Sequence, residues 1–169
     1  MKGTELMLDA FGRVREVVLD TLDGLGGEEL TARTDPGANT IAWLVWHLTR
    51  IQDDHVADVA GTEQIWTAQG WAERFALPFP AHDTGYGHDA DAVGAVAVDS
   101  PDLLAGYYEA VHANTLQYLR GLAATDLERV VDERWTPPVT LAVRLVSVLS
   151  DDLQHAGQAA FVRGALLRR

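Results

Sequence analysis

His155 interrupts the apolar seam of one expected helix and His47 flanks the apolar stripe of another, and these two histidines are the residues of this sequence best placed to do chemistry. Asp151 and Asp152 precede His155 by one turn of an expected helix. Side chains three or four residues apart lie on the same side of a helix, so either carboxylate could share a ligand with His155. A buried polar group costs on the order of 1–3 kcal/mol unless it is paired or coordinated. Spacing therefore predicts a carboxylate–imidazole pair and leaves both aspartates as candidates.

A second helix must supply a further ligand, and His47 is the best candidate because it flanks the apolar stripe of its segment. His55 is the alternative. The two histidines would stand ~12 Å apart along a helix, whereas ligand bonds are only ~2.0–2.2 Å long. One ion could hardly bind both, so His47 is preferred.

Two imidazoles and one carboxylate form a ligand set that suits Zn²⁺, Fe²⁺, Ni²⁺ or Mn²⁺. Such a set leaves coordination positions open, which is typical of catalytic rather than structural sites. An open position can bind water or a thiol and lower its pKa. The competing interpretation is structural, because a lone histidine on an apolar helix face is usually a satisfied core residue.

Composition limits the classes of partner. The 169 residues include 47% hydrophobic side chains, which is ample for one core, so we expect a single domain over residues 1–169. The net charge of −12 argues against nucleic acids and anionic membrane surfaces. With no cysteine, a metal must be held by His, Asp or Glu. The absence of a signal-like N-terminus or a ~20-residue apolar run predicts a cytoplasmic protein.

The helical periodicity predicts an all-α fold, a four-helix bundle with a long irregular crossover between helices two and three. The first, second and fourth helices are expected at about 4–22, 39–59 and 140–167, and the third begins at 101 with a buried side that extends to Leu122. Asn39–Thr40 and Ser100 are good N-caps, and Pro101 suits the first helical position. The GLGG segment at 24–27 ends the first helix, and the WTPPV segment at 135–139 separates the last two.

The crossover at 61–99 has the least regular pattern. Aromatic residues predict a short helical piece at 67–76, which the LPFP sequence at 77–80 stops. Strand-like alternation is limited to a weak stretch at 93–98. Because the crossover carries several large aromatic residues, we expect it to pack over one end of the bundle.

Several motifs together resemble those of a known family. They are WLVWHLTRIQDDHV at 43–56, the DSPDLLAGYYEAVHANTL segment, the WTPPVTLAVRLVS lead-in and DDLQHAGQAAFVRG at 151–164. This pattern resembles the DinB-like family of four-helix bundles, in its actinobacterial branch related to mycothiol-dependent enzymes. The resemblance covers most of the chain, and its most specific element is the terminal His–x–Gly–Gln.

The resemblance implies a divalent metal held by one side chain of the second helix and two of the fourth. The first corresponds to His47. The other two usually read His–x–x–x–His–x–Gly–Gln, so the second falls on His155 and the first on Asp151, where the common pattern has histidine. An acidic residue here resembles the zinc site of mycothiol-dependent maleylpyruvate isomerase. The motif thus favours Asp151, whereas the apolar seam alone would place Asp152 deepest.

Two further residues are predicted to border the site and contact a cofactor. Trp43 stands one turn before His47, and Gln158, one turn beyond His155, could fix a ligand or bind a metal-bound water. Arg50, Arg144 and Arg163 could grip an anionic thiol cofactor, although solvated surface roles are commoner for arginine.

The first functional hypothesis is a metal-dependent transferase or isomerase that uses a low-molecular-weight thiol, mycothiol, on a small electrophile. Zinc is the preferred metal, and nickel, iron and manganese are alternatives. The second hypothesis is a non-catalytic metal-binding bundle that serves as a binding or stress-response module. Metal-dependent hydrolysis is weaker, since the sequence identifies no general base. The resemblance is also consistent with a homodimer.

Overall fold

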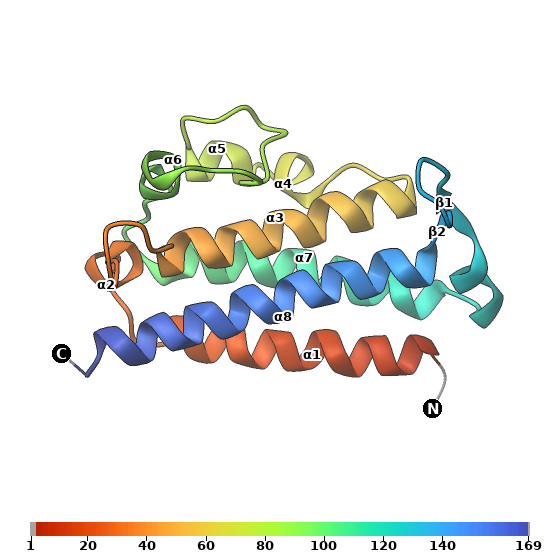
Figure 1. Ribbon diagram of the computed structural model, residues 1–169, viewed down its shortest axis with the longest axis horizontal. Helices are drawn as coiled ribbons and strands as arrows, with labels where there is room; N and C mark the ends of the chain where they lie inside the picture. The colour runs from red at the N-terminus through yellow and green to blue at the C-terminus, as the bar shows by residue number, and fades with distance from the viewer. Residues whose placement is uncertain (1–2, 169) are drawn as a thin grey trace.

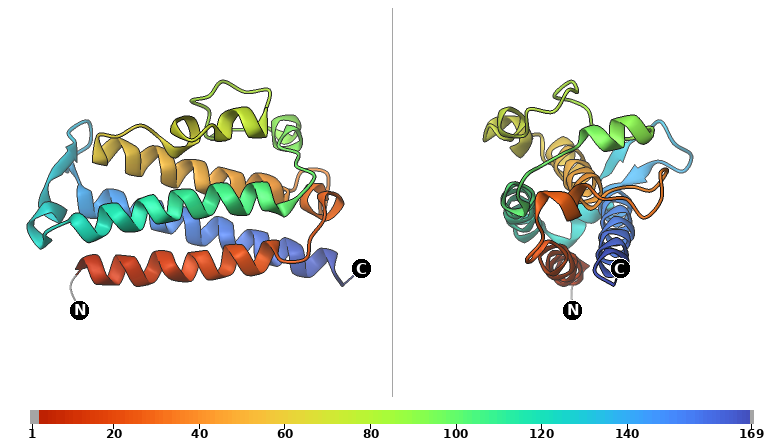
Figure 2. Two further views of the ribbon diagram at one scale, coloured as in Figure 1. Left: turned by 180° about the vertical axis from the view of Figure 1, so that it is seen from behind. Right: turned by 90° about the vertical axis from the view of Figure 1, so that its left-hand side faces the viewer.

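Four long helices form the body of the protein in the computed structural model, which describes residues 3–168. They are α1 (Gly3–Leu22), α3 (Ile41–Ala60), α7 (Pro101–Gly121) and α8 (Leu141–Leu166). Each of α3 and α1 packs against both α7 and α8, which gives a bundle with α1 and α3 on opposite corners (Figures 1 and 2). The predicted all-α four-helix bundle is confirmed.

The crossover between α3 and α7 sets the directions of the helices. It returns the chain to the end of the bundle where α3 began, so α3 and α7 run the same way and α1 and α8 run the opposite way (Figure 1). Because α3 and α8 are neighbours, their polar residues meet inside the bundle.

Capping residues set the helix boundaries, and the sequence had indicated two of them, Thr40 and Ser100. Thr40, Ser100 and Thr140 are N-caps, and each side-chain oxygen accepts a hydrogen bond from a backbone N–H of the first turn. Gly61, with φ of 67°, ends α3 in the left-handed conformation that glycine tolerates. The short helix α2 (Gly27–Thr31), between α1 and α3, was not predicted.

The crossover contains three short helices, α4 (Ile65–Ala68), α5 (Trp71–Phe75) and α6 (Ala90–Ala95). The single helical piece predicted at 67–76 is therefore divided, because Gly70 adopts a left-handed conformation between α4 and α5. The crossover lies along the side of α3 and α7 rather than over one end, so that expectation was wrong (Figure 1). Its aromatic residues pack there: the Trp66 ring lies 5.0 Å from the Tyr107 ring.

The weak strand prediction at 93–98 was also wrong, since Asp89 caps a helix there and accepts from Ala92 N–H. The strands found are β1 (Val130–Asp132) and β2 (Val139–Thr140), an antiparallel pair joined by the WTPPV region. The 3₁₀ helix η1 (Ala124–Glu128) precedes them. Among the described residues, no helix is long and apolar enough to cross a membrane.

A layer of polar side chains separates two apolar clusters in the core. Gln52 of α3, Thr115 of α7 and Asp152 of α8 are fully or almost fully buried, and Gln52 Nε2 donates to Thr115 Oγ1 at 2.7 Å. On α7 and α8, the residues one turn to either side of this layer belong to different clusters. Helix α8 therefore carries polar residues both inside the core and on its side toward α3.

Candidate metal centre

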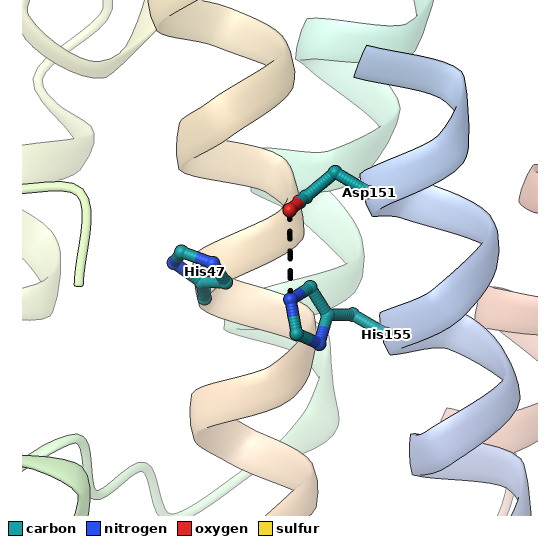
Figure 3. A group of neighbouring side chains, drawn as sticks. All are labelled: His47, Asp151 and His155. Carbon is teal, nitrogen blue, oxygen red and sulfur yellow. Dashed lines mark ion pairs between the residues drawn. The ribbon is translucent and has the colours of Figure 1, made fainter. Parts of the chain in front are cut away.

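Three side chains converge between α3 and α8. His47 extends from α3, and Asp151 and His155 extend from successive turns of α8 (Figure 3). Each offers one ligand atom, and these atoms all lie within 4.8 Å of one another. The structure thus brings together the three residues that were predicted as ligands.

The imidazole of His47 is held in one tautomer by a backbone carbonyl. Its Nδ1 lies 2.5 Å from Thr84 O, and because a carbonyl only accepts, Nδ1 must carry the proton. Nε2 then has a lone pair available for a metal. Burial lowers the pKa of His47, so its imidazole stays neutral, the form that ligates. Trp43 stacks on the His47 ring with 4.6 Å between the ring centroids, so it borders the cluster as predicted.

His155 is fixed by a side chain of its own helix. Its Nδ1 donates to Gln158 Oε1 at 2.8 Å, which leaves Nε2 on the side of Asp151. Nε2 and Asp151 Oδ1 are 3.6 Å apart, and this carboxylate, followed by Gln158, raises the pKa of His155. Gln158 therefore orients a predicted ligand, one of the two roles expected for it.

The loop 81–88, which supplies Thr84, is anchored by a buried arginine. Arg50 is 0% exposed and donates to the carbonyls of Ala81 and Asp83. It also lies 3.6 Å from the buried carboxylate of Asp53. Arg50 thus holds the loop that orients His47 and is not exposed to a cofactor.

His88 and Gly85 fit the same loop closely against α3. Trp43 Nε1 donates to His88 Nδ1 at 3.2 Å, and His88 Nε2 donates to the Asp83 carboxylate at 3.2 Å. Gly85 has φ of 87°, and a Cβ there would lie 3.0 Å from His47 Nδ1. The sequence did not predict this loop, whose only signal was its pair of glycines, because its partners on α3 are 31–45 residues away in the chain.

The two alternative ligands lie elsewhere. Asp152 is 0% exposed and points into the core, where burial and then Asp151 raise its pKa well above the usual range. His55 Nδ1 lies 3.3 Å from Arg144 Nη1. Neither belongs to the cluster of convergent ligand atoms.

The donor set fits a divalent metal. Two imidazole Nε2 atoms and a carboxylate converge, and the other ring nitrogen of each histidine is already hydrogen-bonded, as in metal sites. Asp151 Oδ2 is buried and has no hydrogen-bond partner among residues 3–168. An unpartnered buried carboxylate oxygen is costly, and ligation would satisfy it.

The protein is thus a four-helix bundle in which three possible metal ligands meet between α3 and α8. The family model described as mycothiol S-transferase matches residues 6–167. The chain therefore belongs to the mycothiol S-transferase family, a DinB-like family, which confirms the resemblance of the motifs.

A solved structure shares the fold over its whole length. A conserved protein from Enterococcus faecalis, determined by crystallography, is 32% identical with a TM-score of 0.93. The similarity covers 100% of this chain and 99% of that one. The comparison with curated proteins gave no match.

Proposed function

We propose that this protein joins a low-molecular-weight thiol, mycothiol, to a small electrophile, with a divalent metal held by His47, Asp151 and His155. Family membership supports the thiol, and the convergence of three ligand atoms within 4.8 Å supports the metal. Zinc is the preferred ion because it accepts two imidazoles and a carboxylate and leaves a position open. The convergence of the ligand atoms is the observation that carries the proposal.

Hydrogen bonds and ring contacts within the protein orient the ligand side chains in the absence of substrate. Thr84 O and Gln158 Oε1 fix the two imidazoles so that each presents Nε2. Trp43 covers one face of His47 and its ring meets that of His155 edge-on at 6.1 Å, which keeps water from that side. A bound divalent metal would supply the positive charge that favours the thiolate form of a thiol at neutral pH.

The overall reaction balances simply. With an alkyl halide, the thiol sulfur forms a bond to carbon, the halide departs with the electron pair of its bond, and the thiol proton passes to solvent. With an epoxide or an activated alkene, the sulfur adds to carbon, the C–O or C=C π electron pair moves to the neighbouring oxygen or carbon, and that atom takes up a proton in place of the one lost by the thiol. An isomerase would instead use reversible addition of the thiol. In both cases His47, Asp151 and His155 bind the metal and do not transfer protons.

Metal content and turnover test the proposal together. We expect about one metal ion per chain by elemental analysis, and thiol-dependent consumption of at least one electrophile from a panel of alkyl halides, epoxides and activated alkenes. His155→Gln should lower metal affinity and turnover by at least about 100-fold. His82→Ala, which removes an exposed imidazole outside the cluster, is the matched control.

A metal-free native protein, or turnover that His155→Gln leaves intact, would contradict the proposal. Stoichiometric metal without thiol-dependent turnover would instead support the non-catalytic alternative. The single domain and the homodimer remain predictions that limited proteolysis and light scattering can test.

A further inference from the structure

The indole of Trp43 contacts both imidazoles of the candidate metal centre. It lies almost parallel to the His47 ring, with 11° between the planes, and nearly perpendicular to the His155 ring, at 87°. The two imidazoles themselves meet edge to face, with 4.9 Å between their centroids. Trp43 is buried, so its ring fills the space beside them, and a rotation of the indole would disturb both imidazoles at once.

A hydrogen bond to the loop 81–88 determines how this indole is oriented. Trp43 Nε1 donates to His88 Nδ1 at 3.2 Å. An indole nitrogen is a donor only, so His88 Nδ1 must accept and the imidazole proton must be on Nε2. Nε2 lies 3.2 Å from each carboxylate oxygen of Asp83, to which it donates. Asp83 thus fixes the tautomer in which His88 can hold Trp43.

Aromatic side chains hold the His88 ring in place on its other sides. It stacks on Trp46, with 5.9 Å between the centroids and 20° between the planes, and packs against Phe79 at 4.7 Å. The His88 side chain is only 9% exposed. Leucine or phenylalanine could provide such packing, whereas the bonds to Trp43 and Asp83 require one accepting and one donating nitrogen in the same ring.

Without the His88 acceptor, the indole N–H of Trp43 would be buried and unpartnered. Burying an unpartnered donor is costly, which favours a rotation of the indole toward another acceptor. Rotation moves the ring out of its parallel contact with His47 and its edge contact with His155. The two imidazoles can bind one metal only while their ligand atoms converge.

We infer that His88 is a positioning residue of the metal centre: through Trp43 it holds the imidazoles of His47 and His155 in the orientation that binds a metal. The inference rests on the metal site of the proposed function and adds to it a residue outside the ligand cluster. His88 acts in addition to Thr84, which orients His47 directly from the same loop. The loop 81–88 therefore supports the site through two separate contacts.

Three substitutions of His88 separate its hydrogen bonds from its packing. His88→Leu keeps an apolar side chain against Trp46 and Phe79 and removes both hydrogen bonds. His88→Asn retains an acceptor oxygen near the position of Nδ1, and His88→Gln retains a donor near the position of Nε2. His82→Leu is the matched control, because His82 is an exposed histidine of the same loop.

Zinc affinity, measured by competition with a chelator, should fall at least about tenfold in His88→Leu and His88→Gln. It should stay within about twofold of the native value in His88→Asn and His82→Leu. The visible spectrum of the Co²⁺-loaded protein should change in the first two variants and stay native in the last two, because it depends on ligand geometry. Native affinity in both His88→Leu and His88→Gln, or an equal loss in His88→Asn, would overturn the inference. If His88→Leu does not fold, the comparison of His88→Asn with His88→Gln decides.

A double-mutant cycle tests whether His88 acts through Trp43. Trp43→Phe keeps a ring beside His47 but has no N–H, so adding His88→Leu to it should lower zinc affinity by no more than about twofold further. If the two losses multiply, His88 acts independently of Trp43, contrary to the inference. In metal-free protein, the NMR resonance of the Trp43 indole N–H should move upfield in His88→Leu and return in His88→Asn. A resonance that does not move would show that the hydrogen bond is absent and would also contradict the inference.

Failure of the proposed function gives a different set of results. If zinc binds but no thiol turns over, the proposed function fails and the zinc affinities of the His88 variants still decide the inference. If a thiol turns over and all His88 variants bind zinc like the native protein, the proposed function stands and the inference fails. A native protein that binds no zinc would contradict both.

Discussion

Replacing Gly85 with alanine should show how tightly the loop 81–88 holds His47. At this position a Cβ would lie 2.8 Å from Trp46 Cζ3 and 3.0 Å from His47 Nδ1, whereas carbon atoms normally approach to ~3.5–4.0 Å. Trp46 and His47 are both buried, so neither ring can move aside freely. The alanine must therefore push the loop away from α3.

Two effects lower the free energy of unfolding of Gly85→Ala. A residue with a Cβ at positive φ loses roughly 1–2 kcal/mol, and overpacking a filled site typically costs about 1–3 kcal/mol. Gly85→Ala should therefore lower the free energy of unfolding by about 2–5 kcal/mol. Gly87→Ala is the matched control, because Gly87 has φ of 78° but nothing within 4 Å of its Cβ position. It should lose only the conformational part, about 1–2 kcal/mol.

Urea denaturation followed by tryptophan fluorescence measures both losses. Zinc affinity, measured by competition with a chelator, should fall about 10- to 100-fold in Gly85→Ala and stay near the native value in Gly87→Ala, since Thr84 O orients His47. If the two variants lose the same stability, or if Gly85→Ala keeps native zinc affinity, the loop does not position His47.

Three further predictions concern the surroundings of the cluster. Asp151→Asn should lose zinc affinity and Asp152→Asn should keep it, and equal zinc loss in both variants would refute this assignment. Asp152→Asn should also raise the free energy of unfolding at neutral pH by on the order of 1 kcal/mol or more, because the buried Asp152 carboxyl must take up a proton when the protein folds. Arg50→Met should cost about 3–5 kcal/mol in urea denaturation by leaving buried Asp53 without its cation, and a native-like midpoint would argue against that pair. Because Asp151 raises the pKa of His155, this pair stabilises the metal-free fold fully below the unfolded pKa of about 6.5, and that contribution is lost as pH rises through the folded pKa. Since zinc needs the neutral imidazole, its affinity should rise with pH between roughly pH 5 and 8, and a flat profile by chelator competition would contradict the assignment.

Local sequence signals indicated the bundle and the three residues that converge between α3 and α8. Caps such as Thr40 and Ser100 act within one turn, so the starts of α3 and α7 could be read directly. Helical period placed a carboxylate one turn before His155, and the motif selected Asp151 and His47. The short helices of the crossover and its position were not predicted correctly, because they depend on packing against α3 and α7 rather than on the periodicity of the crossover itself.

Only the tertiary structure decided which side chains face one another. Consecutive residues on a helix point ~100° apart, so the rotation of α8 against α3 determines that Asp151 meets His47 while Asp152 enters the core. The same packing brings Thr84 to His47, although they are far apart in sequence. Local spacing fixes which residues share a helix face, whereas the direction of that face depends on contacts that form only when distant segments close together.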